Sequence, residues 1–277
     1  MRKLLIAKLS IAIIPGMFDI KKKLQEYLPG LFELIGDNEI GWNRLTKIFL
    51  KNYSELEAEY DKGEQPVIRK KNIYSTINYA LNGNQSEIDF RNFINCTFSN
   101  LAILLNKEER KLVCKNVKDF LLFGEDFLNY VAEVAILNNL MKTGTYRLIA
   151  VEAKSPNVRT KIDFKLKDEK KNTEVLVEVV SISIDDRIKR TDDNLTAHIQ
   201  SKIREKLKLK NHSIQNDFIL IPVIWYESPE TLQRIISLCN ANKFDIPGSY
   251  IPHAYSSVML PNNKNELRFG RITTLLS

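Results

Sequence analysis

The feature that most constrains the fold is a strand-like run that is apolar on both of its faces. Residues 174–184, EVLVEVVSISI, place aliphatic side chains at both odd and even positions, and residues 218–226, FILIPVIWY, are continuously apolar. Strands of this kind lie in the centre of a sheet that is covered on both sides. Together with the helical segments before, between and after them, these runs predict an α/β domain built on a mixed sheet.

Hydrophobic periodicity divides the chain into two regions. Residues 1–115 repeat apolar positions at three and four, which predicts a helical region, and residues 116–277 form a second, α/β domain. In this domain we expect a helix at 125–142, strands at 146–153, 161–167 and 174–184, a helix at 194–209, a strand at 218–226 and a helix at 229–242. The order is αβββαβ, then a helix and a tail of short strands or irregular structure.

An excess of basic residues favours a polyanionic partner. The chain carries 41 Lys plus Arg against 34 Asp plus Glu, a formal net charge of +7. Three widely spaced cysteines exclude a disulfide framework, and the absence of a CxxC pair argues against a zinc site. We therefore expect a reduced protein of the cytoplasm.

The N-terminal sequence MRKLLIAKLSIAII is similar to a signal peptide. However, Lys8 interrupts its apolar run, and no small-residue cleavage site follows. We therefore predict a helix in this segment. No apolar run in the chain approaches the roughly 18 residues of a membrane span, so we expect a soluble protein without a membrane partner.

Two carboxylates on neighbouring strands are the strongest indication of a site. Glu178 lies between Leu176 and Val180 on one face of a buried strand, where an ionised carboxylate requires a cation or hydrogen bonds. Asp163 lies on the preceding strand, and a hairpin brings it close to Glu178. Two converging oxygen donors are typical of a Mg²⁺ site. The alternative is a structural ion pair of Glu178 with a lysine or arginine, in which case loss of its charge lowers stability.

These residues resemble the PD-(D/E)XK nuclease superfamily over positions 120–226. That superfamily has an αβββαβ core, with an acid on the first helix, an Asp on the second strand and an acid two positions before a Lys on the third. Glu133, Asp163 in KIDF and Glu178 in VLVEVVS match these positions. The resemblance implies a restriction-endonuclease-like fold. It also implies that Asp163 and Glu178 hold Mg²⁺, with Mn²⁺ as a substitute, and that Glu133 binds it through water or orients the site.

The chain departs from this pattern at two positions. Ile162 replaces the usual Pro, and Val180 stands where the superfamily has its third-strand Lys. Lys165, on the face of Asp163, and Lys202, on the following helix, are the two candidates to replace that lysine as a catalytic residue. A third possibility is that no lysine replaces it and the fold binds without cutting.

A literal ExK motif occurs earlier, at Glu152-Ala153-Lys154. We set it aside because the segment before it is the 125–142 helix, so no Asp precedes it on a paired strand.

A basic segment follows the third strand. Residues 187–210 contain eight Lys or Arg against three acids, a local charge of +5 that predicts contact with phosphates. The proposed nucleic-acid-binding residues are Arg187, Lys189, Arg190, Gln200 and Arg204. For the helical part the alternative is an ordinary solvated face, and His198 is either an accessory group or a surface residue.

The sequence therefore predicts a Mg²⁺-dependent endonuclease that hydrolyses phosphodiester bonds in DNA. The alternative is a catalytically inactive nuclease fold that acts as a nucleic-acid-binding or assembly module. The helical region at 1–115 would read DNA, form a homodimer or bind a protein partner.

Overall fold

The computed structural model describes residues 20–36, 40–48, 50–51, 72–121, 127–154, 161–208, 218–244, 249–259 and 265–277. The helix predicted for the N-terminal fourteen residues lies outside this part of the chain. The chain divides into two compact units, one of Met1–Ala102 with Cys114–Phe127 and one of Ile103–Val113 with Leu128–Ser277. The boundary predicted at 115/116 falls inside a helix, and the roles assigned to the two regions stay predictions.

The first unit is helical where it is described, as the periodicity predicts. Its helices include α2 (Ile20–Tyr27), α3 (Pro29–Ile35) and α5 (Ile73–Leu81), and α6 (Gln85–Leu104) and α7 (Lys107–Phe120) contribute residues to both units. Aromatic contacts join α6, α7 and Phe127, because Phe120 contacts both Phe98 and Phe127 at ring distances of 5.3 and 5.4 Å. Gly30 lets α3 approach α6 closely, since a Cβ there would lie 2.4 Å from the Asn95 carbonyl oxygen.

The second unit is built on a mixed sheet. Its strands are β1 (Tyr146–Lys154), β2 (Lys161–Asp168), β3 (Thr173–Ile182), β4 (Phe218–Trp225), β5 (Ser249–Tyr250), β6 (His253–Met259) and β7 (Asn265–Arg271). Among the described residues these seven strands follow the order β1-β2-β3-β4-β6-β7, with β5 beside β4. The first three strands are antiparallel, β4 runs parallel to β3 and to β6, and β7 is antiparallel to β6.

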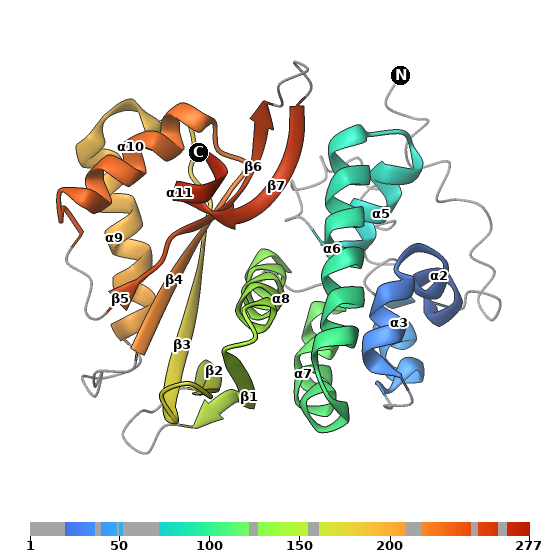
Figure 1. The fold of residues 1–277 in the computed structure, drawn as a ribbon. Helices are drawn as coiled ribbons and strands as arrows, with labels where there is room; N and C mark the ends of the chain where they lie inside the picture. Colours follow the sequence, from blue (N-terminus) through green and yellow to red (C-terminus); the bar gives the residue numbers. More distant parts are fainter. Residues whose placement is uncertain are drawn as a thin grey trace. The chain divides into compact units, whose positions relative to one another are not determined.

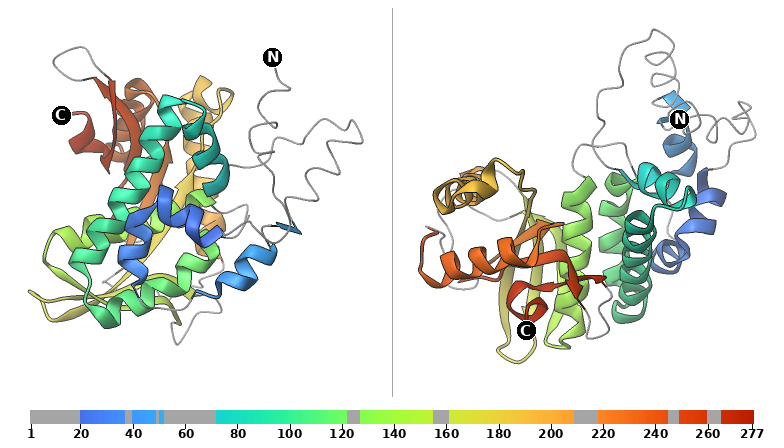
Figure 2. Two further views of the ribbon diagram at one scale, coloured as in Figure 1. Left: turned by 90° about the vertical axis from the view of Figure 1, so that its right-hand side faces the viewer. Right: turned by 90° about the horizontal axis from the view of Figure 1, so that it is seen from above.

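Helices cover both sides of this sheet (Figures 1 and 2). The helices α9 (Asp192–Lys208) and α10 (Pro229–Asn240) lie on one side, and α8 (Phe127–Lys142) lies on the other. Even-numbered residues of β3, such as Val180 and Ile182, pack against Ile199 and Ile203 of α9 in one buried cluster. Both faces of β3 are therefore buried, which is the condition that its sequence predicts, and the predicted αβββαβ order is confirmed.

The segment after α10 is more regular than the sequence indicates. The predicted tail of short strands or irregular structure forms β5, β6, β7 and the short helix α11 (Ile272–Leu275). These strands extend the sheet beyond β4. In the described part of the chain, no helix combines the length and apolarity that crossing a membrane requires.

His253 at the start of β6 makes the stability of this unit depend on pH. Burial lowers its pKa to about 4, a nearby Ile251 carbonyl opposes the shift, and Arg271 adds to it. The unfolded chain then binds the extra proton, so stability is full above pH 6.5 and falls as the pH drops toward 4.

We expect the free energy of unfolding to fall by about 2–3 kcal/mol more in the wild type than in His253→Gln between pH 7.5 and 4.5. Urea unfolding at several pH values measures this difference. Parallel pH profiles of the two proteins would show that His253 is not buried in its neutral form.

Candidate functional site

The site lies where β2 and β3 separate. Their main-chain pairing reaches Phe164 opposite Val177, one position before Asp163 and Glu178. Beyond that point the Val179 N–H donates to Asp163 Oδ2 at 2.8 Å, and the Asp163 N–H approaches Glu178 Oε2 at 3.4 Å. The two carboxylates thus accept main-chain N–H groups in place of carbonyl oxygens of the neighbouring strand. This exchange brings them together, as the predicted hairpin requires.

Lys206 of α9 supplies the cation that Glu178 needs. Its Nζ lies 3.1 Å from Glu178 Oε1 and 3.5 Å from Asp163 Oδ1. The Glu178 side chain is 0% exposed and that of Asp163 is 12% exposed. A buried carboxylate is tolerated when a cation and hydrogen bonds compensate for lost hydration. The structural ion pair considered from the sequence is therefore present, with a lysine that the sequence analysis did not select.

The three carboxylates of this group act on the charge of Lys206. Burial lowers the pKa of Lys206, but the carboxylates of Asp163, Glu178 and Glu133 outweigh burial and raise it above its usual value. Lys206 is therefore an ammonium ion at neutral pH.

Glu133 of α8 is in the same electrostatic environment. Burial raises its pKa well above the usual value, and the charges of Asp163, Glu178 and Glu152 raise it further, while Lys206 opposes them. Glu133 thus lies in the electrostatic surroundings of the carboxylate pair, and its protonated form is favoured there.

The two lysines expected to replace the third-strand lysine pair with other acids. Lys165 Nζ lies 2.7 Å from Glu174 Oε2, and Lys202 Nζ lies 3.2 Å from Glu205 Oε2. Both glutamates are largely exposed, at 61% and 62%. The structure therefore brings Lys206, rather than Lys165 or Lys202, to the carboxylates.

The helical periodicity of the sequence indicates that Lys206 faces the sheet. It follows Ile203 by three positions and Ile199 by seven, so it lies on the buried face of α9. Lys202 occupies a similar position one turn earlier. One turn moves a side chain about 5.4 Å along the sheet, and the sequence does not define the helix position to that accuracy.

The ExK motif Glu152-Ala153-Lys154 lies on the edge strand β1. Glu152 forms an ion pair with Lys161 of β2 and has a positive φ of 50°. The register of β1 and β2 shifts just before this position, between Leu148 and Ala150. Glu152 therefore occupies an irregular part of the edge strand and pairs across to β2.

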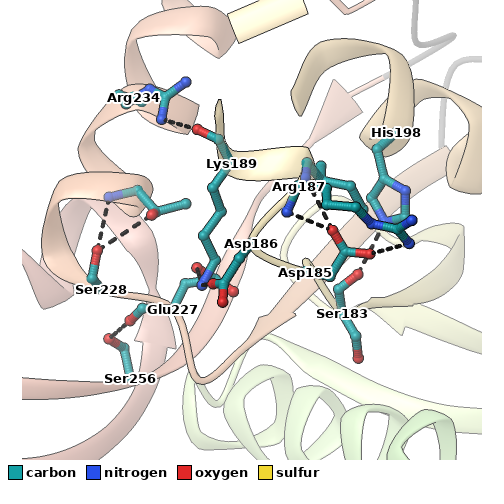
Figure 3. Close-up of polar contacts among 12 residues, drawn as sticks. Ser183, Asp185, Asp186, Arg187, Lys189, His198, Glu227, Ser228, Arg234 and Ser256 are labelled. Atoms are coloured by element: carbon teal, nitrogen blue, oxygen red, sulfur yellow. Dashed lines mark hydrogen bonds and ion pairs between the residues drawn. The ribbon is translucent and has the colours of Figure 1, made fainter. Parts of the chain in front are cut away.

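The basic loop after β3 is folded by its own acids (Figure 3). Asp185 Oδ1 accepts the N–H groups of Arg187 and Ile188 at 2.9 and 3.0 Å, which fixes the start of the 3₁₀ helix η1 (Ile188–Arg190). Arg187 also lies 3.3 Å from Asp185 Oδ2, with its side chain 83% exposed. The loop is therefore ordered locally, and Arg187 projects into solvent.

Lys189 holds this loop against β4 and α10 (Figure 3). Its Nζ lies 3.1 Å from the buried Glu227 carboxylate and 3.3 Å from Asp186. Arg234 of α10 donates to the Lys189 carbonyl at 2.7 Å and to Asp192 at 2.8 Å. Of the predicted nucleic-acid-binding residues, Arg187, Arg190 and Arg204 are exposed, whereas Gln200 and Lys189 are partly buried.

Two side chains of this group carry oxygen donors of the kind that a hard divalent cation prefers. Asp163 and Glu178 present carboxylate oxygens, and Mg²⁺ is commonly held by one or two carboxylates together with water and substrate phosphates. Glu178 Oε1 is buried and faces the Lys206 ammonium, so the protein itself places a positive charge at this oxygen. No cluster of three or more His, Cys, Asp or Glu side chains suited to a metal occurs among the described residues.

Comparison with known proteins assigns no family. No family model and no curated protein matches the sequence. Among solved structures, SfsA of Pyrococcus furiosus in complex with Ca²⁺ is similar at 12% identity and a TM-score of 0.24, over 53% of this chain and 64% of that one. This chain therefore covers less than two thirds of SfsA.

The ion pair predicts how stability responds to loss of Glu178. Glu178→Gln leaves the partly buried Lys206 with less compensation, so we expect the free energy of unfolding to fall by about 2 kcal/mol in metal-free buffer. Removing both charges in Glu178→Gln/Lys206→Met should recover part of this loss. Urea unfolding of the wild type, both single variants and the double variant completes the cycle. Additive losses would contradict the pairing.

Proposed function

We propose that this chain is a metal-dependent endonuclease of the PD-(D/E)XK type that hydrolyses phosphodiester bonds in DNA. The observation that carries the proposal is the Lys206 ammonium 3.1 Å from Glu178 and 3.5 Å from Asp163. This contact supports the proposal because α9 supplies a lysine to the carboxylates. The superfamily carries that lysine on its third strand, at the position where this chain has Val180. The αβββαβ order provides the matching framework.

Each residue of the group has a chemical role in this proposal. Asp163 and Glu178 would hold Mg²⁺, which when bound lowers the pKa of water and offsets charge on the scissile phosphate. The Val179 N–H fixes one oxygen of Asp163 and leaves the other directed toward Lys206. Lys206 would orient the attacking water and stabilise the negative charge that develops on the phosphate. Glu133 would orient the site.

The second candidate is a nuclease fold that binds nucleic acid without cutting it. The observation that favours it is the same ion pair, because Lys206 already compensates both carboxylates within the protein. Cleavage and metal binding separate the two candidates. In either case the helical unit would contribute DNA recognition, dimerisation or binding of a protein partner, in a cytoplasmic setting.

The first test is cleavage of supercoiled plasmid DNA with Mg²⁺ or Mn²⁺. We expect Lys206→Met to lower the rate at least about a hundredfold, in the range of a lost charge-stabilising group. Asp163→Asn and Glu178→Gln should abolish cleavage. Lys202→Met is the matched control, because it removes the same charge one helical turn away from an exposed pair with Glu205.

Three outcomes contradict this assignment. Cleavage that persists in excess EDTA removes the metal from the proposal. Equal rates for Lys206→Met and the wild type remove Lys206 from the chemistry. Absence of cleavage together with tight DNA binding selects the inactive module.

A second test measures metal binding alone. The ammonium of Lys206 and a divalent cation would both be attracted to the carboxylates of Glu178 and Asp163, so they would compete. We expect Lys206→Met to bind Mn²⁺ at least tenfold more tightly than the wild type by calorimetry without DNA, and Asp163→Asn to lose binding. Equal or weaker Mn²⁺ binding by Lys206→Met would show that the ion does not use these oxygens.

A further inference from the structure

One face of the β1–β2 hairpin carries cations on both sides of Asp163. Along β2, Ile162, Phe164 and Leu166 are buried at even positions. The odd positions carry Lys161, Asp163, Lys165 and Lys167, which therefore share the opposite face. Residues two apart on a strand are about 6.6–6.8 Å apart at the Cα. Lys161 and Lys165 therefore flank Asp163 at this spacing.

The neighbouring strand adds to this charge. Arg147 of β1 is exposed and lies directly opposite Lys167 in the register, so both belong to the same face. We call Arg147, Lys161, Lys165 and Lys167 the basic strip. Because β1 is the edge strand, the strip lies at one edge of the sheet (Figure 1).

The arrangement of the strip has an electrostatic cost. Like charges that face each other across a strand pair destabilise it by up to about 1 kcal/mol. Arg147 faces Lys167 in the register of β1 and β2. On its other side Lys167 has Glu174 opposite it, so an acid offsets part of this repulsion and the cations of the face remain in excess.

The acids near the strip are accessible and can be exchanged. Lys165 pairs with Glu174 and Lys161 with Glu152, whose side chains are 61% and 39% exposed. Exposed ion pairs are worth about 0–1 kcal/mol, so a phosphate can replace the carboxylate at little cost. Counting these two acids, the strip carries four positive charges against two negative ones.

In the loop after β3, by comparison, acids offset the positive charges. Arg187 pairs with Asp185, and Lys189 pairs with both Asp186 and Glu227. Lys189 is held by the buried carboxylate of Glu227, an interaction that a phosphate would have to break. The loop is therefore a weaker anchor for a polyanion than the strip.

We propose that the basic strip binds the sugar-phosphate backbone of DNA and directs it along β2 across Asp163. This inference rests on the proposed function, since it names the surface that brings the substrate to the carboxylates. Lys161 and Lys165 hold phosphates on either side of Asp163, and Arg147 and Lys167 extend the contact toward the β2–β3 turn. The strip binds charge and carries no information about base sequence.

The test measures binding without cleavage. Fluorescence anisotropy of a labelled DNA duplex in EDTA, over a range of salt concentrations, gives the affinity and its salt dependence. We expect Lys165→Gln/Lys167→Gln to weaken binding at least tenfold at low salt and to reduce the magnitude of the log–log salt slope by about 2. The control Arg268→Gln/Arg271→Gln makes the same charge change on β7 and should leave both values unchanged.

Two further variants separate the possible results. Arg187→Gln/Arg190→Gln tests the loop, and the inference is overturned if this variant loses binding while Lys165→Gln/Lys167→Gln retains it. It is also overturned if the strip and β7 variants lose affinity equally, because net charge alone then explains binding. Stronger strip-dependent binding to RNA than to DNA would overturn the choice of substrate.

Failure of the strip and failure of the nuclease assignment give different results. DNA binding that depends on the strip, without metal-dependent cleavage, supports the strip as the DNA-binding surface and contradicts the nuclease assignment. If the wild type cleaves DNA with metal and the strip variant binds DNA normally, the nuclease assignment is supported and the strip is not the DNA-binding surface. A wild type that neither binds nor cleaves DNA removes both.

Discussion

The buried carboxylate of Glu178 is the constraint on which the arrangement of the second unit depends. The apolar neighbours that place β3 in the centre of the sheet also deprive this group of water. Its charge therefore requires a cation from an element that packs on β3, and α9 is that element. The contact between Glu178 and Lys206 therefore ties α9 to the strand that it covers. It fixes the position of α9 along β3 to within one helical turn.

The separation of β2 from β3 follows from the same group. A regular antiparallel ladder would pair main-chain groups at Asp163 and Glu178, and would leave both carboxylates without their N–H donors. Instead the side chains accept the N–H groups of Val179 and Asp163, while β3 continues to pair with β4 as far as Ile182. These bonds to charged acceptors, which are the stronger kind, take the place of further pairing between β2 and β3.

The sequence was sufficient for the architecture because burial leaves a periodic pattern. Runs apolar on both faces predict β3 and β4, and the helical stripe Leu195, Ile199 and Ile203 predicts α9. The same reasoning brought Asp163 and Glu178 together. It missed Lys206, because lysines one turn apart on a helix have the same pattern, and only the depth of packing selects between them. The local charge of +5 predicted for the basic segment counts residues 187–210 alone. Asp185 and Glu227, which pair with cations of the loop, lie outside that range.

The register of β2 links the core to the charge on its other face. A shift by one residue would turn Ile162, Phe164 and Leu166 to solvent and bury three lysines, so packing alone excludes it. The position of Asp163 between Lys161 and Lys165 is therefore set by the apolar residues that alternate with them, and no separate interaction is needed to align them. This explains how a hairpin can keep like charges opposite each other: burial of its apolar face outweighs their repulsion.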